Sequence, residues 1–211
     1  MKSRKLFKVC ALLMLAVMSC LLFSGCGGQS EQKKFVITYL PNESTDKNAD
    51  ARKGMAGDLS KVLGMEVTEL VSNDYNAVIE AMRTGKADMA YFGPLSFCLA
   101  YERAGAEPIG MIAKDKDKKN ATYKSVLVTS SKNTDINSIQ DIKGKTMAFV
   151  DPNSTSGNLI PSAAIMKAFP GEKLSMDDLH TNGKFFQAVS FSGKHQAGLA
   201  AVVKLSLIHI S

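Results

Sequence analysis

The sequence contains no tryptophan, and only three histidines and four cysteines occur among its 211 residues. Four cysteines in a chain of this length exclude a small fold that is held together mainly by disulfides. The hydrophobic fraction of 45% is too high for a disordered chain, and the charged fraction of 22% is ordinary for a globular one. The length suits one large domain or two small ones.

Common catalytic signatures are also absent. The chain has no G-x-x-x-x-G-K-[ST] phosphate loop, H-E-x-x-H zinc motif, G-x-S-x-G nucleophile elbow or C-x-x-C pair. Outside the last seven residues, His180 and His195 are the only imidazoles, which argues against a zinc or copper site. We therefore predict no metal, no cofactor and no enzymatic activity.

The first 25 residues have the pattern of an export signal. They contain four bases and no acid, and the uncharged run from Val9 to Phe23 is shorter than the roughly 20 residues of a membrane span. The end of this segment, Leu22 to Cys26, resembles the bacterial lipobox, in which the cysteine is diacylated and becomes the new N-terminus. We predict a signal peptide at 1–25, a lipid on Cys26 and a tether over 26–34. An uncleaved membrane anchor is the alternative.

Most of the formal net charge of +6 belongs to this predicted signal. Without its four bases, 22 of the 26 basic residues remain against 20 acids, so the exported chain carries a charge of about +2. This near balance in an exported chain argues against nucleic acid as a partner. Only Cys98 would accompany the lipid-bearing Cys26, which leaves no pair for a disulfide within the chain.

The last seven residues, 205–211, form an apolar run without a cap or turn residue. Their sequence, Leu-Ser-Leu-Ile-His-Ile-Ser, resembles the translation of a transposon-end adaptor used in sequencing libraries. We predict a non-native tail, which we leave out of the fold prediction, and a natural chain that is longer. A genuine C-terminal strand is the alternative.

Between these ends, short β-rich runs alternate with helical patterns, which predicts an α/β fold with largely parallel sheets. A polar, lysine-rich segment at 114–120 indicates a crossing between two lobes, which we place at 35–120 and 121–204. We expect strands at 35–40, 66–70, 87–92, 109–113, 123–129, 146–150 and 187–191. We expect helices in a stretch ending near 63 and at 75–84, 94–104, 139–143, 158–169 and 194–203.

Polar residues follow several of these strands, directly before the next helix. In open α/β sheets, ligands bind at this carboxyl edge, where helix N-termini offer N–H donors and a positive partial charge to anions. The densest group, 151–158, contains the consecutive hydroxyls Ser154, Thr155 and Ser156 and no Lys or Arg. Such neutral donors suit a small tetrahedral anion that binds reversibly. Helix capping is an alternative of equal weight, and Pro161 indicates that the following helix begins late or is kinked.

Four other side chains lie at predicted strand–helix junctions. His195 could donate a hydrogen bond to an oxyanion from the start of its helix, or it could be a surface or capping histidine. Tyr75, Tyr91 and Tyr123 could each line a site or be core aromatics.

The motifs around these residues resemble those of the phosphate, phosphite and phosphonate substrate-binding lipoproteins of ABC importers. Residues 74–82 are similar to that family's D-Y-x-x-x-I-E segment, and residues 86–96 to its K-x-D-x-A-x-x-G-x-x-S segment. Residues 151–157 match its D-P-x-S-T-S-G signature. Further similarity is found at 123–127 and at 191–195, the latter resembling a segment with a ligand-contacting histidine.

This resemblance implies a two-lobed, hinged protein of the type II periplasmic binding protein-like fold, which closes on its ligand. It implies a monomer that is anchored through Cys26 to the bacterial membrane, faces the periplasm or the cell exterior, and delivers a phosphorus oxyanion to an ABC permease. The family also uses an acidic residue beyond a segment like 200–203, so the resemblance implies that the second lobe is incomplete here. The ligand-binding residues it implies are Tyr75, Tyr91, Tyr123, Ser154, Thr155, Ser156 and His195.

Three alternatives stay open on the sequence. The first is a receptor for another anion, such as a sulfonate. The second is an exported serine hydrolase in which Ser154 or Ser156 acts with His195, although no orienting carboxylate can be assigned. The third is a sensory lobe without a transport role.

Overall fold

The computed structural model describes residues 33–113, 115–205 and 208–210. The chain divides into one unit of residues 1–33 and a second of residues 34–211. The predicted signal peptide, Cys26 and nearly all of the tether lie outside the described residues. No helix in the described part of the chain is both long and apolar enough to cross a membrane.

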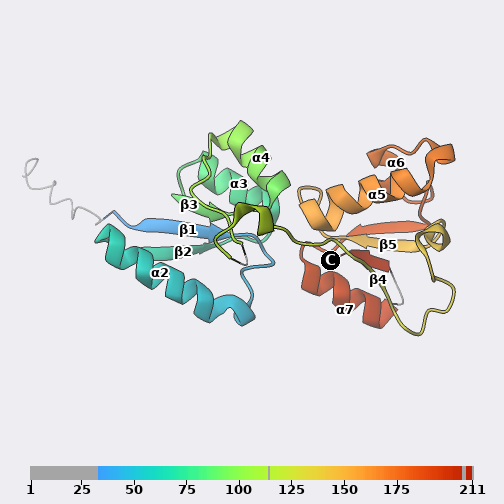
Figure 1. Ribbon diagram of the computed structural model, residues 1–211, viewed down its shortest axis with the longest axis horizontal. Helices are drawn as coiled ribbons and strands as arrows, with labels where there is room; N and C mark the ends of the chain where they lie inside the picture. Colours follow the sequence, from blue (N-terminus) through green and yellow to red (C-terminus); the bar gives the residue numbers. More distant parts are fainter. Residues whose placement is uncertain (1–32, 114, 206–207, 211) are drawn as a thin grey trace, which may run out of the picture. The chain divides into compact units, whose positions relative to one another are not determined.

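The first sheet is parallel throughout, as the alternation of strands and helices predicts. Its strand order is β2-β1-β3, with β1 (Phe35–Tyr39), β2 (Val67–Val71) and β3 (Met89–Tyr91). One face is covered by helix α2, and the other by α3 and α4 (Figure 1). These helices span Ala49–Leu63, Tyr75–Arg83 and Pro94–Ala104, and a 3-10 turn, η1 (Asp46–Asn48), precedes α2.

Short-range signals determine where these helices begin and end. Asp74 accepts a hydrogen bond from the Ala77 N–H at 2.7 Å and caps α3. Gly64 adopts the left-handed backbone conformation that ends α2. Val78 and Ile79 lie fully buried on the apolar face of α3.

The second sheet has the order β4-β7-β5-β6, with one antiparallel pairing, between β4 and β7. Its strands are β4 (Leu127–Thr129), β5 (Thr146–Phe149), β6 (Ala188–Phe191) and β7 (Ile208–Ile210). Helices α5 and α6 cover one face and α7 covers the other (Figure 1). They span Ile160–Ala168, Met176–His180 and His195–Leu205, and 3-10 turns occur at η2 (Lys118–Asn120), η3 (Ile139–Ile142) and η5 (Pro170–Glu172).

A core of aromatic and branched side chains stabilises this second sheet. Phe149 and Phe186 are 0% and 1% exposed, and their rings pack edge-to-face with centroids 6.2 Å apart. Leu179 of α6 is also fully buried, although no helix was predicted at this position. The five residues of α6 are too few for a periodic pattern, and its start is marked only by the Ser175–Asp178 capping box.

Two strand predictions are wrong in whole or in part. Residues 109–113 form no regular structure, and Ile109 is 82% exposed. Of the strand predicted at 123–129, only Leu127–Thr129 pairs with a neighbour. Both segments have β-rich compositions, but a strand also needs a hydrogen-bonded partner, and composition says nothing about partners.

Part of the segment predicted to be a non-native tail is paired within the second sheet. Residues 208–210 form β7, which pairs antiparallel with β4 and parallel with β5. Ile208 is 1% exposed and belongs to the core of the second sheet. The alternative, a C-terminal strand, describes the structure at this position, and the foreign origin of the segment stays a prediction.

Candidate functional site

The Ser154–Ser156 segment lies in a wide helical turn that follows β5. This π turn, η4 (Thr155–Leu159), precedes α5, and Pro161 occupies the first turn of that helix, where a missing N–H is tolerated. The helix therefore begins later than Ser156, as the position of Pro161 predicts. Such wide turns often occur at functional sites.

Ser154 is the capping hydroxyl of this turn. Its Oγ accepts a hydrogen bond from the Gly157 N–H at 3.0 Å, and the residue is 2% exposed. Its side chain also hydrogen-bonds the phenol of Tyr75. The capping interpretation thus applies to Ser154, whereas Thr155 and Ser156 make other contacts.

Tyr75 lies at the start of α3, is 3% exposed and has a raised phenol pKa, mainly because it is buried. The Asn42 amide donates to its oxygen, which also hydrogen-bonds Ser154. These two hydrogen bonds partly offset the effect of burial on the phenol pKa. Because the phenol oxygen accepts a hydrogen bond from Asn42, its own proton can be donated to another group.

Thr155 faces the N-terminus of α4. Its Oγ1 accepts a hydrogen bond from the Leu95 N–H at 2.8 Å, across 60 residues of sequence. A Cβ built on Gly93, the N-cap of α4, would lie 3.3 Å from this Oγ1 and 3.8 Å from the Tyr123 hydroxyl. The connections after β3 and β5 thus meet here, and a Cβ at position 93 would push Thr155 away by a few tenths of an ångström.

His195 begins α7 and contacts both sides of the same region. Its backbone N–H donates to the Asn42 Oδ1 at 2.9 Å. Its ring Nε2 lies 3.5 Å from the Ser156 Oγ, at the limit of a hydrogen bond. Asn42 therefore connects Tyr75 with His195 and holds the starts of two helices together.

Carboxylates also occur close to these side chains. Burial raises the pKa of Asp151, whose carboxylate accepts a hydrogen bond from the Asn153 N–H at 2.8 Å and another from the Tyr75 backbone. Burial also raises the phenol pKa of Tyr91, and the charge of Glu43 contributes to that increase. These acids add negative charge near a segment, residues 151–158, that contains no base.

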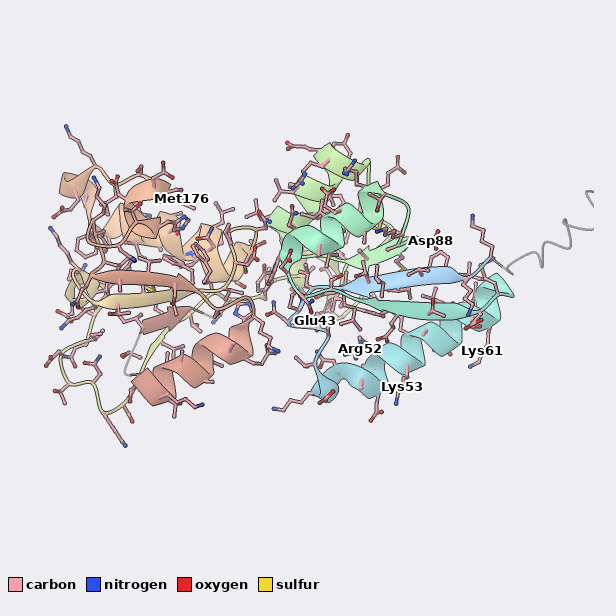
Figure 2. All side chains as sticks on the ribbon, turned by 180° about the vertical axis from the view of Figure 1, so that it is seen from behind. Glu43, Arg52, Lys53, Lys61, Asp88 and Met176 are labelled. Carbon is pink, nitrogen blue, oxygen red and sulfur yellow. The ribbon has the colours of Figure 1, made fainter. Side chains whose placement is uncertain are left out.

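The connection between β1 and α2 is held by Arg52. Its guanidinium donates to the carbonyls of Glu43 and Thr45 at 2.6 and 2.7 Å and pairs with Glu69 at 3.1 Å. Arg52 and Glu43 are labelled in Figure 2 and lie close together. Glu43 itself has a carboxyl pKa raised by burial, which the charge of Arg52 partly offsets. This arrangement fixes the backbone next to Asn42, and so the amide that contacts Tyr75 and His195.

The structure thus connects all the predicted ligand-binding side chains to one region. Ser154 contacts Tyr75, Ser156 lies near His195, and the Thr155 and Tyr123 hydroxyls both lie close to Gly93. Tyr91 and Tyr123 are close enough for an electrostatic interaction, although Tyr123 is 59% exposed. Their role in ligand binding stays a prediction.

Sequence reasoning missed several residues of this region. Asn42 lies in a polar segment after β1, but nothing local distinguishes it from its neighbours. Ser125 donates to the Ser156 carbonyl at 2.6 Å, and Asn158 donates to the Pro152 carbonyl at 2.9 Å. For Asn158, an amide directly after the hydroxyl cluster was the only available signal.

Comparison with known proteins gives consistent results. The family described as "ABC transporter, phosphonate, periplasmic substrate-binding protein" matches residues 37–206. The chain is 31% identical over 157 residues to the phosphate-import protein PhnD of Mycolicibacterium smegmatis, a match that covers 70% of this chain and 49% of that protein. It is 31% identical over 204 residues to the probable ABC transporter phosphite binding protein PhnD1 of Prochlorococcus marinus, over 94% of this chain and 62% of that protein. The chain thus spans about half to three fifths of the length of these relatives.

A solved structure shares the fold. PhnD1 of Prochlorococcus marinus in complex with methylphosphonate aligns with a TM-score of 0.64 at 25% identity, over 84% of this chain and 63% of that one. This likeness confirms the predicted periplasmic binding protein-like α/β fold. Since the family match covers most of the described residues, the chain belongs to the family of periplasmic substrate-binding proteins of phosphonate ABC transporters.

Proposed function

We propose that the protein captures a small phosphorus oxyanion, namely a phosphonate, phosphite or phosphate, and delivers it to the permease of an ABC importer. The observation that carries this proposal is the placement of Thr155 and Ser156, in a wide turn at a helix start, beside the Tyr123 hydroxyl and the His195 ring. The names of the relatives, which include phosphate, phosphite and phosphonate binding, support this ligand class.

The chemistry of the site fits a tetrahedral anion. The first N–H groups of a helical turn have no acceptor within that turn, so those of Thr155 and Ser156 can point at a ligand oxygen. The two hydroxyls, the Tyr75 phenol and the His195 ring add side-chain donors on other sides. We propose that Ser154 acts mainly as the cap that shapes the turn, and that Tyr91 and Tyr123 contact the ligand with their rings or hydroxyls.

Neutral donors favour reversible binding over tight capture. A Lys or Arg would add a full charge, whereas hydroxyl and N–H groups share the anion's charge among several weaker bonds. A receptor that hands its ligand to a permease needs this reversibility. Buried Asp151 also disfavours excess negative charge, which favours ligands in a protonated or singly charged form.

Calorimetric titration tests the proposal. We expect methylphosphonate, phosphite or phosphate to bind with a dissociation constant well below millimolar, and sulfate and alkanesulfonates to bind more weakly. Thr155→Val and Ser156→Ala should each weaken binding roughly 10- to 100-fold, because a hydrogen bond to a charged group is lost. Thr122→Val, at an exposed position, is the matched control. The proposal fails if no phosphorus ligand binds below millimolar.

The same titration separates transport from the alternatives. A preference for alkanesulfonates would identify a sulfonate receptor. Turnover of phosphate esters that is lost in Ser156→Ala would identify a hydrolase, for which the 3.5 Å approach of Ser156 to His195 is the relevant geometry.

We also propose the cellular placement that the N-terminal sequence predicts. Residues 1–25 direct export, Cys26 carries two acyl chains, and residues 26–34 tether a monomer with lobes at 35–120 and 121–204 to the outer face of the membrane. In a bacterial host, radiolabelled palmitate should be incorporated, and Cys26→Ala should abolish the label. Incorporation that persists in Cys26→Ala would contradict the anchor.

A further inference from the structure

His180 is the last residue of α6 and contacts Asn158, in the same turn as Thr155 and Ser156. Its Nε2 is 2.7 Å from the Asn158 Oδ1. Asn158 is 2% exposed, and its Nδ2 donates to the Pro152 carbonyl at 2.9 Å. A continuous chain of hydrogen bonds therefore runs from His180 through Asn158 to the segment that leads into the three hydroxyls.

The partners of Asn158 determine which atoms donate. A carbonyl can only accept, so the atom facing Pro152 must be the amide Nδ2, and the atom facing His180 is the Oδ1. The Ser162 hydroxyl, which is fully buried, also approaches this Oδ1 at 3.5 Å. His180 Nε2 must therefore carry a proton and donate it to Asn158.

The His180 ring also packs against the strands that lead to the site. It meets Phe149 of β5 and Phe191 of β6 edge-on, with ring centroids 5.1 and 5.2 Å apart. Phe149 precedes the Ser154–Ser156 segment by five residues, and Phe191 precedes His195 by four. The backbone also joins these strands, since the Ser192 N–H donates to the Phe149 carbonyl at 2.8 Å. The His180 ring thus packs against both strands that lead to the site, β5 before Ser154 and β6 before His195.

The surroundings of His180 favour the neutral ring. Burial lowers the His180 pKa, and the charge of Asp177, on the same helix, partly offsets this effect. The groups that meet the ring from other elements, namely Phe149, Phe191 and Asn158, are uncharged. Protonation is therefore disfavoured while the ring is packed, and acid favours conformations in which it leaves this position.

We propose that His180 is a positioning residue, whose Nε2–H holds Asn158 and thereby keeps the turn at 154–159 in the shape that presents its donors to the oxyanion. This inference rests on the proposed function for its ligand, but its first consequence is independent of any ligand. The closure of the turn itself, through the Gly157 N–H to Ser154 Oγ and the Leu159 N–H to Ser154 carbonyl bonds, depends on His180.

Amide hydrogen exchange of the ligand-free protein is the first test. At about pH 7.5, His180→Ala should accelerate exchange at Gly157 and Leu159 by roughly 5- to 100-fold, since a buried acceptor loses its donor. The amides of α2, which packs on the first sheet, serve as the internal control and should change little. His180→Gln places an amide N–H near the position of Nε2 and should retain most of the protection.

The pH dependence separates positioning from packing. The pKa of His180 lies below its ordinary value of 6.5, so the wild-type turn should be fully protected above about pH 7 and lose protection as the pH falls below 6.5. His180→Gln cannot titrate and should lack this loss. Asp177→Asn removes the charge that favours protonation of the packed ring, so the loss should still begin near pH 6.5 but should become larger and extend to lower pH.

Methylphosphonate affinity is the second readout. His180→Ala should weaken binding by roughly 5- to 100-fold, and His180→Gln by much less. Any pH effect that both proteins share, such as ionisation of the ligand, cancels in the ratio of the wild-type to the His180→Gln association constant. This ratio should decrease when the pH is lowered below 6.5.

The outcomes distinguish the two proposals. Unchanged exchange at Gly157 and Leu159 in His180→Ala overturns the positioning role. An acceleration of the same size in α2 also overturns it, because that result indicates general destabilisation. If no phosphorus oxyanion binds the wild type but exchange responds as expected, the proposed function fails and the positioning role of His180 stands.

Discussion

Replacing Gly157 by alanine tests whether the shape of the turn controls both stability and binding. A Cβ built on Gly157 would lie 2.4 Å from both Val150 Cβ and Cγ2, and 2.9 Å from Ser154 Oγ. Carbon atoms pack at about 3.5–4.0 Å, so the two contacts with Val150 would be more than 1 Å too short. Either Val150 or the turn must move.

Val150 is poorly able to move. It is fully buried against Leu40, Tyr75 and Val78, and its N–H donates to the Gly157 carbonyl at 3.0 Å. Overpacking of such a site costs about 1–3 kcal/mol. The turn would be displaced as well, and with it the hydroxyls of Thr155 and Ser156. We therefore expect a loss of about 2 kcal/mol in the free energy of unfolding, or roughly 4–8 °C in melting temperature.

Gly57→Ala is the matched control. Gly57 lies within α2, and its added Cβ would have no atom within 4 Å, so the substitution should stabilise the helix by about 0.5–1 kcal/mol. Thermal melting and methylphosphonate titration measure both variants. A loss of stability in Gly157→Ala together with a gain in Gly57→Ala would show that the close approach at Gly157 is the cause. A Gly157→Ala protein that melts and binds like the wild type would refute the reasoning.

Three further substitutions probe the region around the site. Asn42→Ala should weaken methylphosphonate binding roughly tenfold in titrations, because a partly buried hydrogen-bond partner of Tyr75 is removed, whereas exposed Asn73→Ala should not. Asp74→Ala should lower the unfolding free energy in urea by about 1 kcal/mol through loss of the α3 cap. Glu43 has a pKa above its ordinary 4.5, so the folded state binds a proton more readily than the unfolded state. Glu43→Gln should therefore be more stable than the wild type near neutral pH, and this advantage should shrink as the pH falls toward 4.5; an advantage independent of pH would contradict the assignment.

The sequence was a good guide to elements whose signals are local. The cap at Asp74, the glycine that ends α2 and the late start of α5 at Pro161 act within one or two helical turns. Such signals operate in the same way whatever the rest of the chain does. The grouping of polar residues after strands likewise follows from the parallel pairing, because that pairing brings the carboxyl ends to one edge.

Predictions that depend on distant partners were less successful. The β-rich segment 109–113 has no strand beside it among the described residues, and stays irregular. Residues 208–210, left out of the fold prediction, pair between β4 and β5. Strand propensity describes how well a side chain fits a pleated surface, and it carries no information about whether an unpaired edge is available.

The functional site shows the same difference between local signals and distant partners. The sequence by itself determined that hydroxyls, tyrosines and a histidine gather at the carboxyl edge, and it determined the family through the D-P-x-S-T-S-G motif. Only the tertiary structure decided their roles: Ser154 caps the turn, Thr155 meets an N–H 60 residues away, and Asn42 meets the His195 N–H 153 residues away. A hydroxyl can cap, accept or donate equally well. Its role is therefore set by the partners that packing places within about 3 Å, and those of Thr155 and Asn42 lie too far along the chain for any local pattern to specify.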